Sequence, residues 1–444
     1  MVTLIKNTRI INRGNSVYGD ILIKDNRIVK CGGVIDVREN AEEINGEGLW
    51  CVPGIIDDQV HFREPGYTHK ADIASESRAA IAGGVTSFME MPNTFPPAVT
   101  TQLLEDKYRI AARSAYANYS FFMGVSNDNY DELMRVDPAR VCGYKIFMGS
   151  STGSLLVDDR AVLEKVFEAA PMLIATHCED ENTVKSRSEL FRQQYGPDAP
   201  ARIHPAIRNE EACLLSSSFA KELAVRYGTR LHILHITTAA EVGLFTDTAP
   251  LRDKKITSEV CVHHLYFSDE DYDRLGNRIK CNPAIKTSAD RDALFKGLLD
   301  GKLDIIATDH APHTAEEKAK PYFEAPAGLP LVQHSLNIML DFHHRGMISM
   351  EQVVEKMCHA PAECFRVKER GYLDEGYFAD VVLIDPAHEW TVSPENILYK
   401  CRWSPLEGKT FRGKVHTVLL NGSLAFADGM PVKTEAPMRL EFDR

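Results

Sequence analysis

The middle of the chain alternates eight times between a short apolar segment and an amphipathic segment. The apolar segments are predicted strands, and they are Cys51–Phe62, Thr86–Met91, Tyr119–Val125, Cys142–Met148, Met172–His177, Arg230–Ile236, Lys255–His263 and Leu303–Thr308. Helical periodicity marks intervening segments such as Ile73–Ala82, Arg160–Ala169, Glu210–Tyr227 and Ala289–Leu299. Eight strand–helix units in succession predict an α/β fold, a parallel (β/α)8 or TIM barrel. Two further helices are expected after it, at Leu331–His343 and Ser349–Phe365.

Both ends of the chain have the pattern of β-strands instead. Strands are predicted at Thr3–Ile11, Gly19–Lys24 and Arg27–Cys31, and again at Asp380–Ile384 and Val415–Leu420, which the turn signal Asn421-Gly422 follows. We therefore expect one small β-sandwich domain built from residues 1–50 and 371–444, and a barrel over residues 51–370. A length of 444 residues suits a barrel with one added domain.

Composition excludes several classes of protein. The formal charge is −12, and no basic stripe is present, which argues against nucleic-acid binding. No apolar run is long enough to span a membrane, and the start does not resemble a signal peptide. The ten cysteines form no CxxC pair, so we expect reduced thiols in the cytoplasm. An anionic substrate would have to be captured by local cations.

Residues of metal-binding type occur where the predicted barrel strands end. They are His61, Lys145, His177, His235 and Asp309. Taken singly, a histidine here is more often an ordinary polar residue, and Asp309 could cap the next helix. Because the carboxyl ends of barrel strands meet at one mouth, the five together indicate a metal site.

Lys145 lies within an apolar strand. Burial would lower the pKa of its amine, which leaves a neutral nucleophile able to react with carbon dioxide. The resulting carbamate could bridge two divalent cations. The alternative is a lysine side chain that reaches past the barrel rim to solvent.

Two motifs resemble the signatures of the dihydroorotases. Asp57-Asp-Gln-Val-His61-Phe-Arg63-Glu-Pro-Gly66 resembles D-x-H-x-H-x-R-x-P-G, and Ala307-Thr-Asp309-His-Ala-Pro-His313 resembles the second signature. The segments around Asn93, Asn282 and Asp380 also fit, and the likeness extends in the right order over essentially the whole chain. It implies a cyclic amidohydrolase of the metal-dependent amidohydrolase superfamily.

The resemblance implies two zinc ions bridged by carbamylated Lys145. His177 and His235 would complete one site, and His61 and Asp309 the other. The chain departs from the family at Gln59, where the family has a histidine. A glutamine offers a weaker oxygen ligand for zinc, so we predict one normal site and one of reduced affinity. Alternatively, Gln59 only forms a hydrogen bond nearby and one metal suffices.

The implied reaction is the reversible cyclisation of N-carbamoyl-L-aspartate to L-dihydroorotate and water in de novo pyrimidine biosynthesis. Asp309 would serve as general base and then as general acid. Arg63, two residues beyond His61, is expected on the same side of the strand, where it would bind a substrate carboxylate. The rest of the substrate pocket would comprise Asn93, Asn282, His313, Ala327 and Gly328. The pair His263-His264 has no family role and is interpreted as structural.

Two other functions remain open. One is an allantoinase or hydantoinase-like ring opener, against which Arg63 and Asn93 argue. The other is a non-catalytic dihydroorotase-like subunit that supports aspartate transcarbamoylase, for which Gln59 would be a first sign. The retained Lys145, His177, His235 and Asp309 argue against that case. The family resemblance also implies a homodimer.

Overall fold

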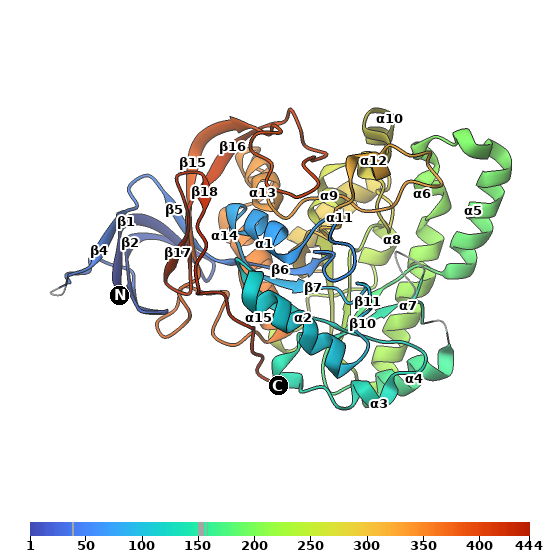
Figure 1. Cartoon of the computed structure of the whole chain (residues 1–444), viewed down its shortest axis with the longest axis horizontal. Coiled ribbons are helices and arrows are strands. Elements are labelled where there is room, and N and C mark those ends of the chain that lie inside the picture. The colour runs from blue at the N-terminus through green and yellow to red at the C-terminus, as the bar shows by residue number, and fades with distance from the viewer. Residues whose placement is uncertain (38–39, 150–154, 158) are drawn as a thin grey trace.

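The computed structural model describes residues 1–37, 40–149, 155–157 and 159–444. A β-sheet made from both ends of the chain lies beside a barrel, at the left of Figure 1. The nine strands of this sheet are β1 (Val2–Asn12), β2 (Asn15–Lys24), β3 (Arg27–Cys31), β4 (Glu42–Asn45), β5 (Trp50–Pro53), β15 (Val381–Thr391), β16 (Thr410–Leu420), β17 (Ser423–Ala427) and β18 (Met430–Pro431). The antiparallel pairing of β5 with β15 joins the two ends of the chain.

The barrel strands pair in parallel. They are β6 (Ile55–Val60), β7 (Val85–Glu90), β8 (Asn118–Phe121), β9 (Met123–Gly124), β10 (Tyr144–Phe147), β11 (Ile174–His177), β12 (Leu231–Ile233), β13 (Ile256–Cys261) and β14 (Ile305–Ala307). A parallel bridge between Val60 and His310 connects the last strand region to the first. The predicted barrel with a terminal β domain is confirmed.

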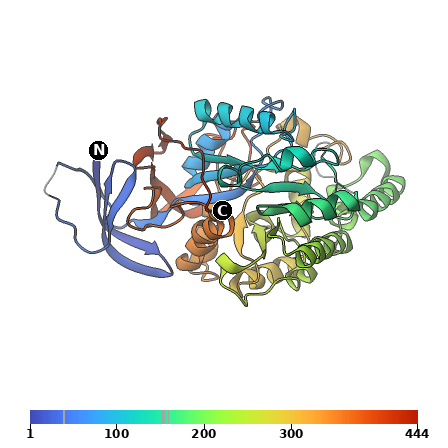
Figure 2. The same cartoon turned by 90° about the horizontal axis from the view of Figure 1, so that it is seen from below.

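Helices cover the outside of the barrel, as Figures 1 and 2 show. They are α1 (Ile73–Ala82), α2 (Thr101–Ser114), α3 (Tyr130–Leu133), α4 (Arg160–Ala169), α5 (Glu181–Tyr195), α6 (His204–Ile207), α7 (Glu210–Tyr227), α8 (Ala239–Val242), α9 (Val262–Tyr266), α10 (Tyr272–Leu275), α11 (Ser288–Leu299), α12 (Ala315–Lys318), α13 (Ser335–His344), α14 (Met350–Val354) and α15 (Ala360–Phe365). Side-chain caps begin several of them: Asp72 accepts from the Ser75 amide at α1, and Asn209 from the Ala212 amide at α7. None of the described helices is long and apolar enough to cross a membrane.

Three predicted elements are divided. The expected strand Cys51–Phe62 is two strands, because the chain leaves the terminal sheet at Gly54 and enters the barrel. Gly54 is packed so tightly that an added Cβ would lie 2.0 Å from Thr86 Oγ1. Tyr119–Val125 is split into β8 and β9. A π-helical segment, Glu355–His359, interrupts the helix expected over Ser349–Phe365.

An apolar cluster lies in the interior of the barrel. It includes Ile56, Met89, Leu173 and Ile305 from four different barrel strand regions, together with Phe365 of α15. Because side chains from separate strands meet there, the barrel is a packed core and not a pore.

Candidate active site

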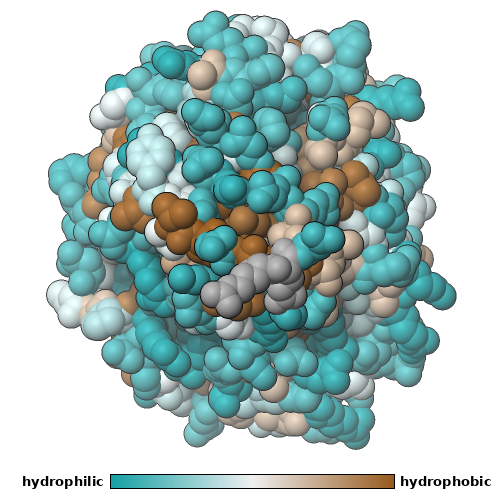
Figure 3. Space-filling model, turned by 90° about the vertical axis from the view of Figure 1, so that its left-hand side faces the viewer, coloured by the Kyte–Doolittle hydropathy of each residue, from teal (hydrophilic) through white to brown (hydrophobic). Residues whose placement is uncertain are grey.

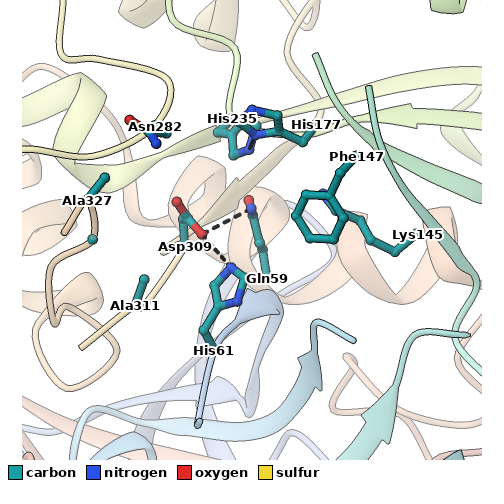
Figure 4. Close-up of a pocket in the computed structure, with 11 residues that line it drawn as sticks. Gln59, His61, Lys145, Phe147, His177, His235, Asn282, Asp309, Ala311 and Ala327 are labelled. Atoms are coloured by element: carbon teal, nitrogen blue, oxygen red, sulfur yellow. Dashed lines mark hydrogen bonds and ion pairs between the residues drawn. The ribbon is translucent and has the colours of Figure 1, made fainter. Parts of the chain in front are cut away.

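The carboxyl ends of the barrel strands surround one cavity (Figure 4). Its lining residues are Gln59, His61, Lys145, Phe147, His177, His235, Asn282, Asp309, Ala311, Ala327 and Gly328. All five residues predicted as metal ligands are therefore gathered at one place, although 248 positions separate His61 from Asp309 in the sequence. Asn282, Ala327 and Gly328, predicted for substrate, line the same cavity.

His177 and His235 lie side by side in the lining of the cavity. Nδ1 of His177 lies 3.0 Å from Nε2 of His235, and both rings are buried. Burial lowers the pKa of both imidazoles below the usual value, which favours their neutral, metal-binding form. Two zinc-bound nitrogens at about 2.0 Å from the metal stand about 3.3 Å apart in a tetrahedral site. The pair therefore fits a zinc ion.

Glu179 orients His177 and was missed in the sequence analysis. Its carboxylate is fully buried, lies 3.0 Å from Nε2 of His177 and forms an ion pair with Arg208. Burial opposes its ionisation, yet Arg208 and His177 hold the pKa of Glu179 at about 2. A carboxylate at this distance favours the tautomer with the proton on Nε2, which leaves the Nδ1 lone pair of His177 available to a metal. The only signal in the sequence is an acid two residues beyond the end of a strand.

His61 and Gln59 both contact Asp309. Nε2 of His61 lies 3.1 Å from Oδ1 of Asp309, and Nε2 of Gln59 donates to the same oxygen over 3.2 Å (Figure 4). Nδ1 of His61 donates to Oδ1 of Asn93 over 2.8 Å. In that tautomer the Nε2 lone pair of His61 faces a carboxylate oxygen, an arrangement that a cation between the two atoms would stabilise.

Lys145 is 1% exposed, so its side chain does not reach solvent beyond the rim. Nζ lies 4.6 Å from the centroid of the Phe147 ring, another lining residue that the sequence analysis missed. Burial lowers the pKa of the Lys145 amine to about 7, although Asp309 and Glu259 oppose the shift. Near neutral pH a large fraction of this amine is therefore unprotonated.

Arg63, Asn93 and His313 lie next to the cavity and do not line it. Nε of Arg63 donates to the Pro312 carbonyl over 3.1 Å, and its Nη2 lies 3.0 Å from Nε2 of His313. His313 in turn contacts the carbonyl of Ala327, a lining residue, at 2.9 Å. Burial lowers the pKa of Arg63 to about 10, so the guanidinium remains charged at neutral pH. Within the described part of the chain, no carboxylate forms an ion pair with it.

Three site residues have left-handed backbone conformations. The φ angles are +69° at Arg63, +39° at His235 and +44° at Asp309. Such angles cost a non-glycine residue about 1–3 kcal/mol, and they are concentrated at functional sites. Each of the three follows the end of a barrel strand, where a sharp turn directs the side chain or the next peptide toward the mouth.

The comparisons with known proteins identify the family of the chain. The amidohydrolase family profile matches residues 50–425. A dihydroorotase of Halobacterium salinarum is 33% identical over 397 residues, which cover 85% of this chain and 90% of that protein. A dihydroorotase of Clostridioides difficile is 30% identical and covers 95% of this chain and 99% of its own length.

Solved structures support the fold. The L-hydantoinase of Arthrobacter aurescens superposes with a TM-score of 0.93 over 99% of this chain and 100% of its own, at 23% identity. A dihydropyrimidinase of Brevibacillus agri superposes with a TM-score of 0.90 over 100% of both chains, at 22% identity. At such identities the likeness concerns the barrel and its terminal β domain alone. From the family profile and the relatives at 30% identity or more, the chain belongs to the amidohydrolase family and, within it, to the dihydroorotases.

Proposed function

We propose that this protein catalyses the reversible cyclisation of N-carbamoyl-L-aspartate to L-dihydroorotate and water. The observation that carries the proposal is Arg63, a buried guanidinium beside the cavity that has no ion-pair partner in the described structure. A buried cation without an anion is costly, and a substrate carboxylate would neutralise it. Hydantoin rings lack this carboxylate, so the same residue favours a dihydroorotase over a hydantoinase.

We infer that the cavity holds zinc, with Lys145 as its central ligand after carbamylation. The neutral amine attacks carbon dioxide, an N–C bond forms, one C–O π bond becomes an oxyanion lone pair, and a proton leaves the nitrogen. The carbamate, His177 and His235 would hold one ion, and the carbamate, His61 and Asp309 a second. Gln59 presents its amide N–H to Asp309, which supports lower affinity at the second position.

A bound divalent ion would supply Lewis acidity toward the reacting carbonyl and a lowered pKa for the attacking water. Asp309 moves the proton. In the ring-opening direction it takes the proton of the water that attacks the ring carbonyl and passes it to the departing ring nitrogen, and cyclisation reverses both transfers. Its Oδ1 accepts a hydrogen bond from Nε2 of Gln59, which helps to position the carboxylate for these transfers.

The direct test is an assay with purified protein whose zinc content is known. We expect turnover of dihydroorotate and of carbamoyl aspartate, and little or no hydrolysis of hydantoin or allantoin. Ring opening of hydantoin or allantoin alone would assign the protein to the other cyclic amidohydrolases. A metal-free protein that turns over neither substrate, even after incubation with zinc and bicarbonate, would favour a non-catalytic subunit.

We also propose a homodimer that works in the cytoplasm. Figure 3 shows a band of hydrophobic residues on the end of the molecule formed by the terminal sheet. Exposed apolar side chains in and next to this sheet include Val17, Tyr18, Val29 and Val34. Packing these side chains against a second copy of the chain would remove apolar surface from water. The ten cysteines are all unpaired, which suits a reducing compartment. Light scattering coupled to size exclusion tests the dimer: a monomer at micromolar concentration would contradict it.

A further inference from the structure

A second group of metal-binding side chains lies in the barrel interior and does not line the cavity. Asp58 of β6, His232 of β12 and Glu259 of β13 offer ligand atoms within 4.8 Å of one another, and all three residues are 0% exposed. We propose that Asp58, His232 and Glu259 hold a buried zinc ion, separate from the reaction site and structural in role. We call these three residues the interior triad.

The spacing of the ligand atoms fits a small divalent ion. Nε2 of His232 lies 3.3 Å from Oδ2 of Asp58 and 3.2 Å from Oε2 of Glu259. Zinc bonds of about 2.0 Å in tetrahedral geometry separate neighbouring ligand atoms by about 3.3 Å. Both distances are longer than the usual 2.9–3.0 Å of an N–H···O hydrogen bond. The two distances from His232 therefore fit ligands of one ion, and the two carboxylates lie within 4.8 Å of each other.

Hydrogen bonding fixes the orientation of His232. Thr257 Oγ1 donates to the Leu231 carbonyl, so its lone pair is left to accept from Nδ1 of His232, 2.9 Å away. A metal-binding histidine usually donates its other ring N–H in this way. With the proton on Nδ1, a neutral His232 directs the Nε2 lone pair at two carboxylates. A cation between the imidazole and the two carboxylates would stabilise this arrangement.

A proton alone satisfies the triad poorly. One N–H of a charged His232 can donate to a single carboxylate, and the geometry with Glu259 meets the criteria of a hydrogen bond. Both oxygens of Asp58 are then left without any hydrogen bond in the described structure. A buried carboxylate without a donor costs several kcal/mol. A divalent ion bound to two carboxylates and a neutral imidazole gives a net charge of zero.

The triad also supports the reaction site. Oε1 of Glu259 accepts from the backbone N–H of His235 over 3.2 Å, at the residue whose φ is +39°. An ion that fixes Oε2 of Glu259 thereby fixes the peptide that presents a reaction-site ligand. Below the triad, the His232 ring packs against Phe365 at 5.4 Å between ring centroids, so the site is closed toward the apolar cluster.

The test is the zinc content of four proteins that are loaded with zinc and then dialysed. Asp58→Asn should hold one equivalent fewer than the wild type. Asp57→Asn is the matched control, because Asp57 is the adjacent buried acid and binds Thr308 instead of the triad. His177→Asn should lose zinc from the reaction site and keep the triad equivalent, which separates a failure of this proposal from a failure of the proposed function. Equal zinc in wild type and Asp58→Asn would overturn the proposal.

If Asp58→Asn does not fold, the wild-type protein decides the question alone. Crystals grown with zinc should give an anomalous difference peak about 2.0–2.2 Å from Asp58 Oδ2, His232 Nε2 and Glu259 Oε2. Density without such a peak would leave protons as the cations of the triad and would overturn the proposal.

Discussion

The amide of Gln59 donates a hydrogen bond to Oδ1 of Asp309 over 3.2 Å, on the side where His61 approaches the same oxygen. From the resemblance to the dihydroorotase signature a histidine is expected at this position, and an imidazole would offer a nitrogen lone pair to a metal. The glutamine instead presents an N–H group to Asp309, the proposed general base. The substitution therefore exchanges an acceptor for a donor at one half of the site.

Replacing Gln59 with histidine should restore the weakened zinc position. We expect Gln59→His to hold about one more equivalent of zinc than the wild type after dialysis, because imidazole binds zinc more strongly than an amide oxygen does. Inductively coupled plasma mass spectrometry measures the difference. Gln59→Asn serves as the control, since it keeps an amide and should not gain zinc. Unchanged zinc in Gln59→His would refute this account of the substitution.

Carbamylation of Lys145 should depend on pH in a defined direction. Burial places the pKa of this amine at about 7, and only the neutral amine attacks carbon dioxide. In metal-free protein at a fixed concentration of dissolved carbon dioxide, the rate of reactivation by zinc should rise between about pH 6 and pH 8 and then level off. A rate that is independent of pH over this range, or one that keeps rising toward pH 10, would contradict a lowered pKa.

Removing the amine is a second test of the proposed role of Lys145. We expect Lys145→Ala to lose turnover and most of its reaction-site zinc, since no bridging oxygen is left. A short carboxylic acid such as acetate or propionate fits the vacated space chemically, and it should restore part of the activity. Lys165→Ala, a change in α4 outside the cavity, is the control and should behave as wild type. Full activity in Lys145→Ala would end the proposed metal bridge.

The gathering of the five strand-end residues was predictable, because parallel barrel strands bring their carboxyl ends together whatever their separation in sequence. The direction in which the Arg63 side chain points could not be predicted. Alternation along a strand places residues 61 and 63 on one side, but the φ of +69° at Arg63 ends the extended backbone and takes the guanidinium to Pro312 and His313.

The interior triad also could not be predicted from the sequence. A register shift in the β6–β7 pairing between Asp57 and Val60 breaks the regular alternation around Asp58 and Gln59. Asp58 lies close to His232 and Glu259. These three residues come together because the barrel closes, and no local motif in the sequence indicates it. Glu179 is a similar case, because its role comes from contacts with His177 and Arg208.

Asp309→Asn should separate proton transfer from binding. The amide keeps the shape of the side chain but cannot accept a proton, so we expect kcat to fall roughly 10²–10⁴-fold, the usual contribution of a general base. KM should change less than about threefold, since Arg63 and the other predicted substrate contacts remain. Zinc content is measured in parallel, because Asp309 is also a proposed ligand. A variant that keeps its zinc and its wild-type kcat would rule out Asp309 as the base.

Arg63→Met should change substrate choice. Methionine fills much of the apolar space of the arginine stem but offers no charge, and a hydrogen bond to a charged group contributes about 2–3 kcal/mol. We therefore expect KM for dihydroorotate to rise roughly 30- to 150-fold. The variant should hydrolyse dihydrouracil, the same ring without the carboxylate, no worse than the wild type does, because this substrate has no carboxylate to bind the guanidinium.

Arg109→Met, at an exposed position of α2, is the matched control. If both substrates lose the same factor, Arg63 supports the fold of the loop that contains Pro312 and His313 and does not recognise the carboxylate. A selective loss for the carboxylated ring is the result that only charge recognition explains.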